Sequence, residues 1–355
     1  MDVQERKIRE LRHLLHENAE LSGKEEKTRR ILKEFLREHT HLEIKDEGPW
    51  FYAKYKGNPG DSWVALRADF DALPAKDGTV KHLCGHDGHA AALCYTGMLL
   101  EENHVKENVI LLFQPAEETG TGAVLCSGLF EKENVRAIYG CHNLPGFPLG
   151  IVYTKPGTFA CASRGLEMTL TGKPTHAAYP ENGISPAPVL GKLLRRIDEL
   201  NESAKEKLCM ITVIGADMGS ESYGIAADQA VLRVTLRAEN DEDLASFEAG
   251  LLNYAGKLCA ERKLEFSFRV LDPFPATVNV PEHAEHILKA CGGKVLETPM
   301  RWSEDFGNYL RGCPGAFFGI GSGENCPGLH TENYEYPDEI LRFTAHAFFD
   351  IVTVK

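Results

Sequence analysis

The chain of 355 residues exceeds the roughly 250 to 300 residues at which a single hydrophobic core stops growing, so we expect two domains. Its composition, 43% hydrophobic and 26% charged, is typical of a globular protein and excludes a disordered or collagen-like chain. Acidic residues outnumber basic ones by 52 to 39, and no apolar run approaches the roughly 20 residues that span a bilayer, which argues against nucleic-acid and membrane partners.

The first predicted elements are two amphipathic helices within residues 5–38. Apolar residues recur at helical spacing on one face of each, namely Ile8, Leu11, Leu14 and Leu15, then Ile31, Leu32, Phe35 and Leu36. This charged, amphipathic start does not have the form of a secretion signal. Most of the ten cysteines lie singly in apolar segments, as reduced core thiols do. We therefore expect a cytoplasmic protein.

Four short apolar runs come next and alternate with helical stretches at 88–104 and 121–132. The runs are WFYAKY, SWVALRAD, NVILLFQP and VRAIYGCH. Strands that alternate with helices predict an α/β fold with a mainly parallel sheet and helices on both faces. Ligands bind beyond the carboxyl ends of such strands, so we expect the polar segments RADFDALP, PAEETG and CHN to converge there.

From about Gly165 the pattern changes to strand, helix, two strands, helix and strand. This β-α-β-β-α-β order predicts a smaller α+β domain with a core of its own, inserted into the first domain. We place the inserted domain at 164–272, between a first segment at 1–163 and a second at 273–355.

The hexapeptide CGHDGH, Cys84 to His89, is the first candidate metal-binding motif. Cys, His and Asp are common ligands of divalent transition metals, and Gly85 permits the tight backbone that lets Cys84 and His86 reach one ion. A glycine-rich turn, in which Asp87 or His89 caps the following helix, is the alternative.

Two further segments add residues of the same chemical types. Glu117 and Glu118 follow an apolar strand, so that one could bind a metal while the other accepts a proton from water. A solvated acidic pair at a helix N-terminus is the alternative. His142 and His330 would each be read as structural if they stood alone, but their occurrence together with the other motifs favours a metal site.

Six segments, in their order and spacing, resemble the M20 metallopeptidase family and, more narrowly, its amidohydrolase branch. They are ALRADFDALP, HLCGHDGHAA, LLFQPAEETGTGA, GKPTHAAYPENGISP, SEDFGNYL and LHTENYEYPDE. That branch contains N-acyl-amino-acid, hippurate and auxin-conjugate hydrolases and N-acetyl-diaminopimelate deacetylases. The resemblance, which runs from Leu11 to Asp350, implies a binuclear metal hydrolase that releases a carboxylic acid and a free amino acid. It also implies a homodimer that forms through the inserted lid domain.

Carried onto this chain, the resemblance implies five ligands of two divalent ions, with Glu117 as general base: Cys84, His86, Glu118, His142 and His330. A thiolate favours zinc, and manganese, cobalt or nickel would also fit. His176 is implied to donate to the substrate carbonyl and its oxyanion, usually in the partner subunit. We expect nearby acidic and imidazole groups to hold the ligands by hydrogen bonds, namely Asp69, Asp71, Asp87 and His89. The sequence assigns no role to Glu304 and Asp305 in SEDF.

The chain departs from the family pattern at two places. GIAAD, Gly224 to Asp228, replaces an Asn-Val-Ile-Pro-Asp-like segment, and the 75–83 loop is short. Both departures leave the acyl group and the amino acid open. Three other functions also stay open: a dipeptidase or aminopeptidase of the same family, a catalytically silent metal-containing binding protein, and a structural zinc protein. The last is disfavoured because structural zinc sites usually have four ligands.

Overall fold

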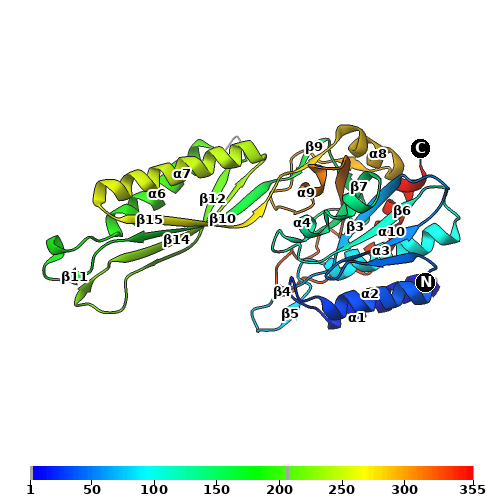
Figure 1. Ribbon diagram of the computed structural model, residues 1–355, viewed down its shortest axis with the longest axis horizontal. Coiled ribbons are helices and arrows are strands. Elements are labelled where there is room, and N and C mark those ends of the chain that lie inside the picture. The colour runs from blue at the N-terminus through cyan, green and yellow to red at the C-terminus, as the bar shows by residue number, and fades with distance from the viewer. Residues whose placement is uncertain (1–2, 205–207, 355) are drawn as a thin grey trace. The chain divides into compact units, whose positions relative to one another are not determined.

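The computed structural model describes residues 3–204 and 208–354. The chain divides into two compact units (Figure 1), of which the first contains both chain termini. Unit 1 comprises Met1–Phe159, Thr277–Thr298 and Asp305–Lys355, and unit 2 comprises Ala160–Ala276 and Pro299–Glu304.

Unit 1 is built on an eight-stranded sheet with the strand order β1-β2-β6-β3-β7-β18-β8-β17. The neighbours β6, β3, β7 and β18 run parallel, whereas β2 is antiparallel to β6. The strands are β1 (Glu43–Asp46), β2 (Phe51–Tyr55), β3 (Trp63–Asp69), β6 (Val109–Gln114), β7 (Val135–Leu144), β8 (Val152–Thr154), β17 (Lys294–Val295) and β18 (Gly315–Gly321). Every residue of β3, β6 and β18 is buried, as expected for strands covered on both faces. The predicted α/β class is confirmed.

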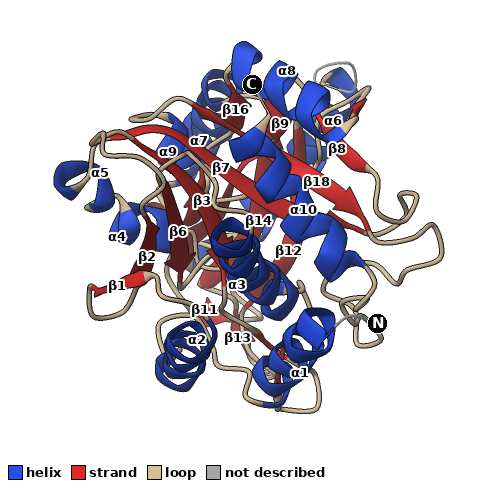
Figure 2. Cartoon of the chain, turned by 90° about the vertical axis from the view of Figure 1, so that its right-hand side faces the viewer, coloured by secondary structure: helices blue, strands red, loops and turns tan. Residues whose placement is uncertain are grey.

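The core of unit 1 centres on α3, which is buried along nearly its whole length. Helices α1, α2 and α10 pack against it, as Figure 2 shows. The helices are α1 (Val3–Glu17), α2 (Glu26–His39), α3 (His86–Glu102), α4 (Gly122–Cys126), α5 (Leu129–Lys132), α8 (Pro281–Cys291), α9 (Gly307–Leu310) and α10 (Ile340–Thr353). The stretch 121–132, expected as helical, forms two short helices with a break at Ser127 and Gly128. Two small ladders complete the unit, β4 (Leu73–Pro74) with β5 (Val80–Lys81) and β9 (Gly157–Ala160) with β16 (Thr277–Asn279).

Unit 2 is a four-stranded antiparallel sheet in the order β12-β14-β10-β15, packed against two helices. Its main elements are β10 (Ala162–Thr171), α6 (Ala187–Ser203), β12 (Met210–Met218), β14 (Gln229–Ala238), α7 (Asp241–Arg262) and β15 (Glu265–Phe274). A short ladder joins β11 (Thr175–His176) to β13 (Ile225–Ala226), with a single turn of 3₁₀ helix at Pro180–Asn182. Alternate residues of β14 are buried, as the period of a strand with one covered face requires. The predicted β-α-β-β-α-β order is confirmed.

The structure also bears on the cysteines and on the length of the apolar helices. Eight of the ten cysteines are buried, as expected of core thiols, and the other two are half-buried. Within the described residues, no helix has the length and apolarity that crossing a membrane requires.

Candidate metal centre

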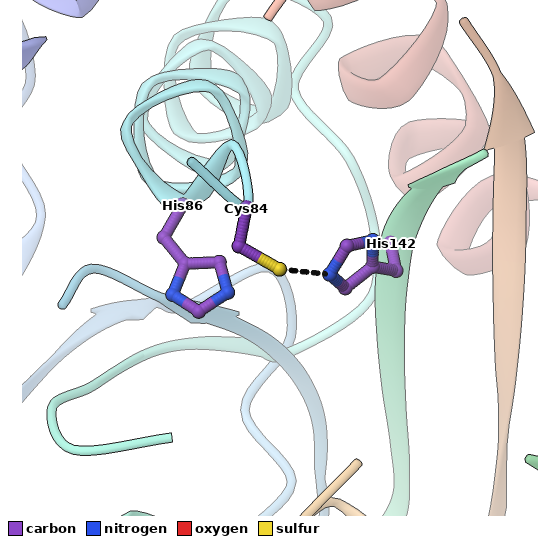
Figure 3. A group of neighbouring side chains, drawn as sticks. All are labelled: Cys84, His86 and His142. Atoms are coloured by element: carbon purple, nitrogen blue, oxygen red, sulfur yellow. Dashed lines mark hydrogen bonds between the residues drawn. The ribbon is translucent and has the colours of Figure 1, made fainter. Parts of the chain in front are cut away.

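The candidate ligands lie where the parallel strands of unit 1 end and α3 begins. Cys84 directly precedes α3, His86 is its first residue, and His142 lies near the carboxyl end of β7. Figure 3 shows Cys84 and His86 at the start of this helix, with the Cys84 sulfur directed at the imidazole of His142. The candidate site therefore lies at the carboxyl ends of the parallel strands, where it was predicted.

Short distances link all five side chains. Cys84 Sγ lies 3.4 Å from His142 Nε2 and 3.3 Å from His330 Nε2. Glu118 Oε1 lies 3.8 Å from His86 Nε2 and 3.5 Å from His330 Nε2. Glu117 joins this cluster, since its carboxylate and the donor atoms of His86 and Glu118 all lie within 4.8 Å of one another. Residues drawn from four separate motifs are thus brought together.

Two atoms of this cluster are buried without a hydrogen-bond partner among the described residues, His86 Nε2 and Glu118 Oε1. Buried polar atoms are normally satisfied, so these two point to a group that accepts their electron pairs. A divalent cation fits, because thiolate, imidazole and carboxylate are the donors that zinc and related metals take. Five mixed donors exceed the four of a closed structural zinc site and suit a binuclear centre.

Hydrogen bonds fix how two of the histidines face the cluster. His86 Nδ1 lies 3.0 Å from Asp71 Oδ1, and His142 Nδ1 lies 2.8 Å from the carbonyl oxygen of Asn143. Because a carboxylate or carbonyl only accepts, each Nδ1 carries the proton and each Nε2 is left as a donor atom for a metal. Asp71 also accepts the backbone N–H of Glu118 at 3.0 Å, so it orients two candidate ligands at once.

The other acidic and imidazole residues of the two motifs make different contacts. His89 bridges Asp69 Oδ1 and Asn143 Oδ1, at 2.6 Å each, and so links β3 to β7. Asp87 Oδ1 accepts the N–H of Gly88, while its Oδ2 lies 2.9 Å from His16 Nδ1 on α1. Asp87 therefore ties the start of α3 to the first helix of the chain.

The backbone is in the left-handed region at several points around the cluster, among them Gly85, Ala116 and His330. Gly85 has φ 90°, and a Cβ there would lie 2.6 Å from Tyr334 Oη, so only glycine fits. Ala116, which precedes the two glutamates, has φ 54°, and His330 has φ 61°. Such conformations cost non-glycine residues energy and concentrate at functional sites.

Burial and charge set the protonation states of the metal-free cluster. Burial raises the pKa of the Cys84 thiol well above its usual range, and the neighbouring Glu118 and Glu117 raise it further. Burial alone would lower the pKa of His86, but the charge of Asp69 and the hydrogen bond to Asp71 outweigh it and raise the pKa to about 10. Burial lowers the pKa of His142 well below its usual value, so this imidazole is neutral.

Metal binding should therefore release about two protons per chain near pH 7, one from Cys84 and one from His86, because both must be deprotonated to act as ligands. The sign follows from the raised pKa values: both groups hold their protons at neutral pH, so the apparent affinity rises with pH. Zinc titrations by calorimetry, in buffers of different ionisation enthalpy, give the number released. The Cys84→Ser variant, which lacks the thiol and is expected to bind fewer ions, should release fewer protons per chain. Release of no protons would contradict the prediction.

His176 belongs to unit 2, on β11, where its side chain is exposed and its Nδ1 accepts the backbone N–H of Ala178 at 3.0 Å. Its role toward a substrate carbonyl stays a prediction.

A buried polar network lies beside Glu117, and none of the sequence motifs predicted it. Arg67 is fully buried and lies 2.7 Å from Asp69 Oδ2 and 2.9 Å from Asp305 Oδ1. Gln114, the last residue of β6, also bonds to Asp305. A charged residue inside the otherwise apolar run WVALRAD was the signal that could have pointed to this network, since a buried arginine needs buried partners.

The chain is similar to known proteins over nearly its whole length. A family model described as peptidase family M20/M25/M40 matches residues 65–353. The chain is 26% identical to an N-acetyldiaminopimelate deacetylase of Exiguobacterium sibiricum, over 94% of this chain and 95% of the relative. It is 28% identical to a hippurate hydrolase of Campylobacter jejuni, over 93% of this chain and 92% of the relative.

A solved structure agrees with these sequence matches. The fold superposes with a TM-score of 0.83 on a dinuclear metal-binding peptidase of the M20 family from Bacillus subtilis, which is 25% identical. The superposition covers 99% of this chain and 98% of that one.

Proposed function

The chain belongs to peptidase family M20/M25/M40, a family of metal-dependent hydrolases, and from this premise we propose that it cleaves the amide bond of an N-acyl-amino acid. The proposed products are a carboxylic acid and a free amino acid. Support comes from relatives of nearly equal length that are named as a deacetylase and a hippurate hydrolase. The reaction is proposed to take place in the cytoplasm.

One observation carries the proposal, the position of the Glu117 carboxylate beside the ligand cluster. Glu117 is 5% exposed and lies within 4.8 Å of the donor atoms of His86 and Glu118. Its Oε1 accepts a hydrogen bond of 3.2 Å from the backbone N–H of Asp305. A carboxylate so placed is next to two candidate ligands and is itself fixed by the backbone, as a general base has to be.

We assign the metals to Cys84, His86, Glu118, His142 and His330, with zinc as the expected ion and manganese, cobalt or nickel as alternatives. Two divalent ions at this site would polarise the amide carbonyl and lower the pKa of water. Glu117 takes a proton from the attacking water, whose oxygen forms the new bond to the carbonyl carbon. Glu117 then gives the proton to the amine as the C–N bond breaks. His176 donates to the oxyanion in this proposal.

We further propose that the two domains have different functions. Residues 1–163 and 273–355 form the catalytic domain, and 164–272 form a lid through which a homodimer assembles. The segment Gly224–Asp228 pairs through β13 with the strand that carries His176, so its departure from the family pattern lies beside the residue proposed to donate to the oxyanion. The short 75–83 segment, which includes β5 of the β4–β5 hairpin, is tied to the His330 loop because the N–H of Lys76 donates to Glu332 Oε1 at 3.0 Å.

The first test is the metal content per chain, together with hydrolysis of acetyl, benzoyl and longer acyl amino acids in the presence of zinc or manganese. We expect two ions per chain and release of the free amino acid. Dipeptides run beside this panel, because turnover of dipeptides alone would replace the proposal with a dipeptidase or aminopeptidase. Two bound ions without turnover of any substrate would indicate a binding protein.

A further inference from the structure

Asp305, the second acidic residue of SEDF, touches the proposed general base through its backbone. Its N–H donates to Glu117 Oε1 at 3.2 Å. Its side chain is fully buried and points into the network at the ends of β3 and β6. Because Asp305 lies 188 positions from Glu117 in the sequence, only the fold brings the two together.

Four donor contacts hold the Asp305 carboxylate in one orientation. Arg67 Nη2 donates to Oδ1 at 2.9 Å, and Gln114 Nε2 lies 2.9 Å from each of the two oxygens. The N–H of Ala123, in the short helix α4, donates to Oδ2 at 2.8 Å. A carboxylate with both oxygens bound to buried donors cannot turn without losing hydrogen bonds that water cannot replace.

The donors are themselves fixed. Gln114 Oε1 accepts from Arg67 Nε at 2.7 Å and from Tyr309 Oη at 2.8 Å, so its amide cannot flip. Arg67 Nη1 also donates to Asp69 Oδ2 at 2.7 Å. Asp69 in turn holds His89, which ties the network to the strand that carries His142.

We propose that Asp305 is a positioning residue for Glu117. Its carboxylate, anchored by Arg67, Gln114 and Ala123, aims the Asp305 N–H at one oxygen of Glu117 and thereby fixes where the second oxygen lies. This inference rests on the proposed role of Glu117 as general base. Stability alone does not account for the network, because buried ion pairs are often no more stable than apolar residues of the same volume.

The main test is Asp305→Asn, which keeps the shape of the side chain. The amide has one acceptor oxygen instead of two. Its NH₂ would face the fixed NH₂ of Gln114, so that one hydrogen bond to the side chain at position 305 is replaced by two donors in contact. We expect kcat to fall by about 10- to 100-fold with KM within about threefold, because a misplaced base lowers the rate without weakening substrate binding. The metal content should stay at two ions per chain.

A graded variant and a control separate positioning from stability. Gln114→Met keeps the volume but removes one donor to Asp305, and should lower kcat less than Asp305→Asn does. Asn279→Ala is the control: Asn279 is buried in the same unit and bonds to the backbone of Phe317 in β18. It should lower the unfolding temperature as much as the network variants do while leaving kcat unchanged.

A double-mutant cycle tests whether Asp305 acts through Glu117. In a Glu117→Gln background the base is already lost, so Asp305→Asn should add little further loss of kcat. An equal loss in both backgrounds, or a wild-type kcat in Asp305→Asn, overturns the inference.

Crystal structures of the zinc-loaded wild type and of Asp305→Asn give a readout that does not need turnover. We expect one Glu117 rotamer in the wild type and more than one, or a shifted one, in the variant. An unchanged Glu117 in the variant overturns the positioning role. If the wild type hydrolyses no acyl-amino acid, the proposed function fails, and these structures still decide the inference.

Discussion

Glu117→Gln is expected to lower kcat by on the order of 10²- to 10⁴-fold while two metal ions stay bound. The amide has nearly the shape of the carboxylate but cannot accept and return a proton. Gln still offers an oxygen to the N–H of Asp305, the contact that the wild-type side chain makes at 3.2 Å. The protein should therefore fold and bind metal as the wild type does. Steady-state kinetics and metal analysis of the same preparation check both halves of the prediction.

The neighbouring carboxylate provides the matched control. Glu118→Gln removes the same charge one position further along, but from a residue whose Oε1 faces His86 and His330. This variant should lose metal as well as turnover, whereas Glu117→Gln should lose turnover alone. Full activity in Glu117→Gln would refute the assignment of the base. Loss of metal from both variants would mean that Glu117 is a ligand too.

The local pattern of the sequence was enough to predict most of the elements that carry the site. Apolar runs such as NVILLFQP predicted the buried strands, and the helical stretch predicted at 88–104 corresponds to α3, which begins two residues earlier at His86. Glu118 follows β6 and His142 lies near the carboxyl end of β7, so the rule that parallel strands share a carboxyl edge already implied that these two segments would meet. These elements follow from periodicity within ten or twenty residues of the chain.

The contacts that hold these residues in place were beyond such reasoning. Asp87 is held by His16, 71 positions away, and Arg67 pairs with Asp305 across 238 positions. Which of several acidic residues meets a given partner depends on how helices and loops pack, and no local pattern encodes that. The break of the predicted 121–132 helix at Ser127 and Gly128 has a local cause, because Gly is unfavourable inside a helix.

Cys84→Ser is expected to reduce the metal content from two ions per chain to one or fewer. Loss of a group that only supports a metal ligand typically lowers activity by roughly 10- to 100-fold, and we expect Cys84→Ser to lower turnover by more than that. Cys84 Sγ lies 3.4 Å from His142 Nε2 and 3.3 Å from His330 Nε2, so its loss affects both sides of the cluster. A serine oxygen at this position is a harder donor and a weaker acid. The ions that remain should be replaced more readily by manganese.

Cys94→Ser, a change of the same kind on the helix that follows Cys84, is the control for the removal of a buried thiol. Cys94 is fully buried in the apolar core of unit 1, so this variant should lose stability and keep both ions. Metal analysis of the two variants under equal zinc supply then separates ligand loss from destabilisation. If Cys84→Ser retains two ions and wild-type turnover, the thiol is not a ligand, and the remaining histidine and glutamate donors alone would have to hold the centre. If both serine variants lose metal equally, the loss follows from folding rather than from coordination.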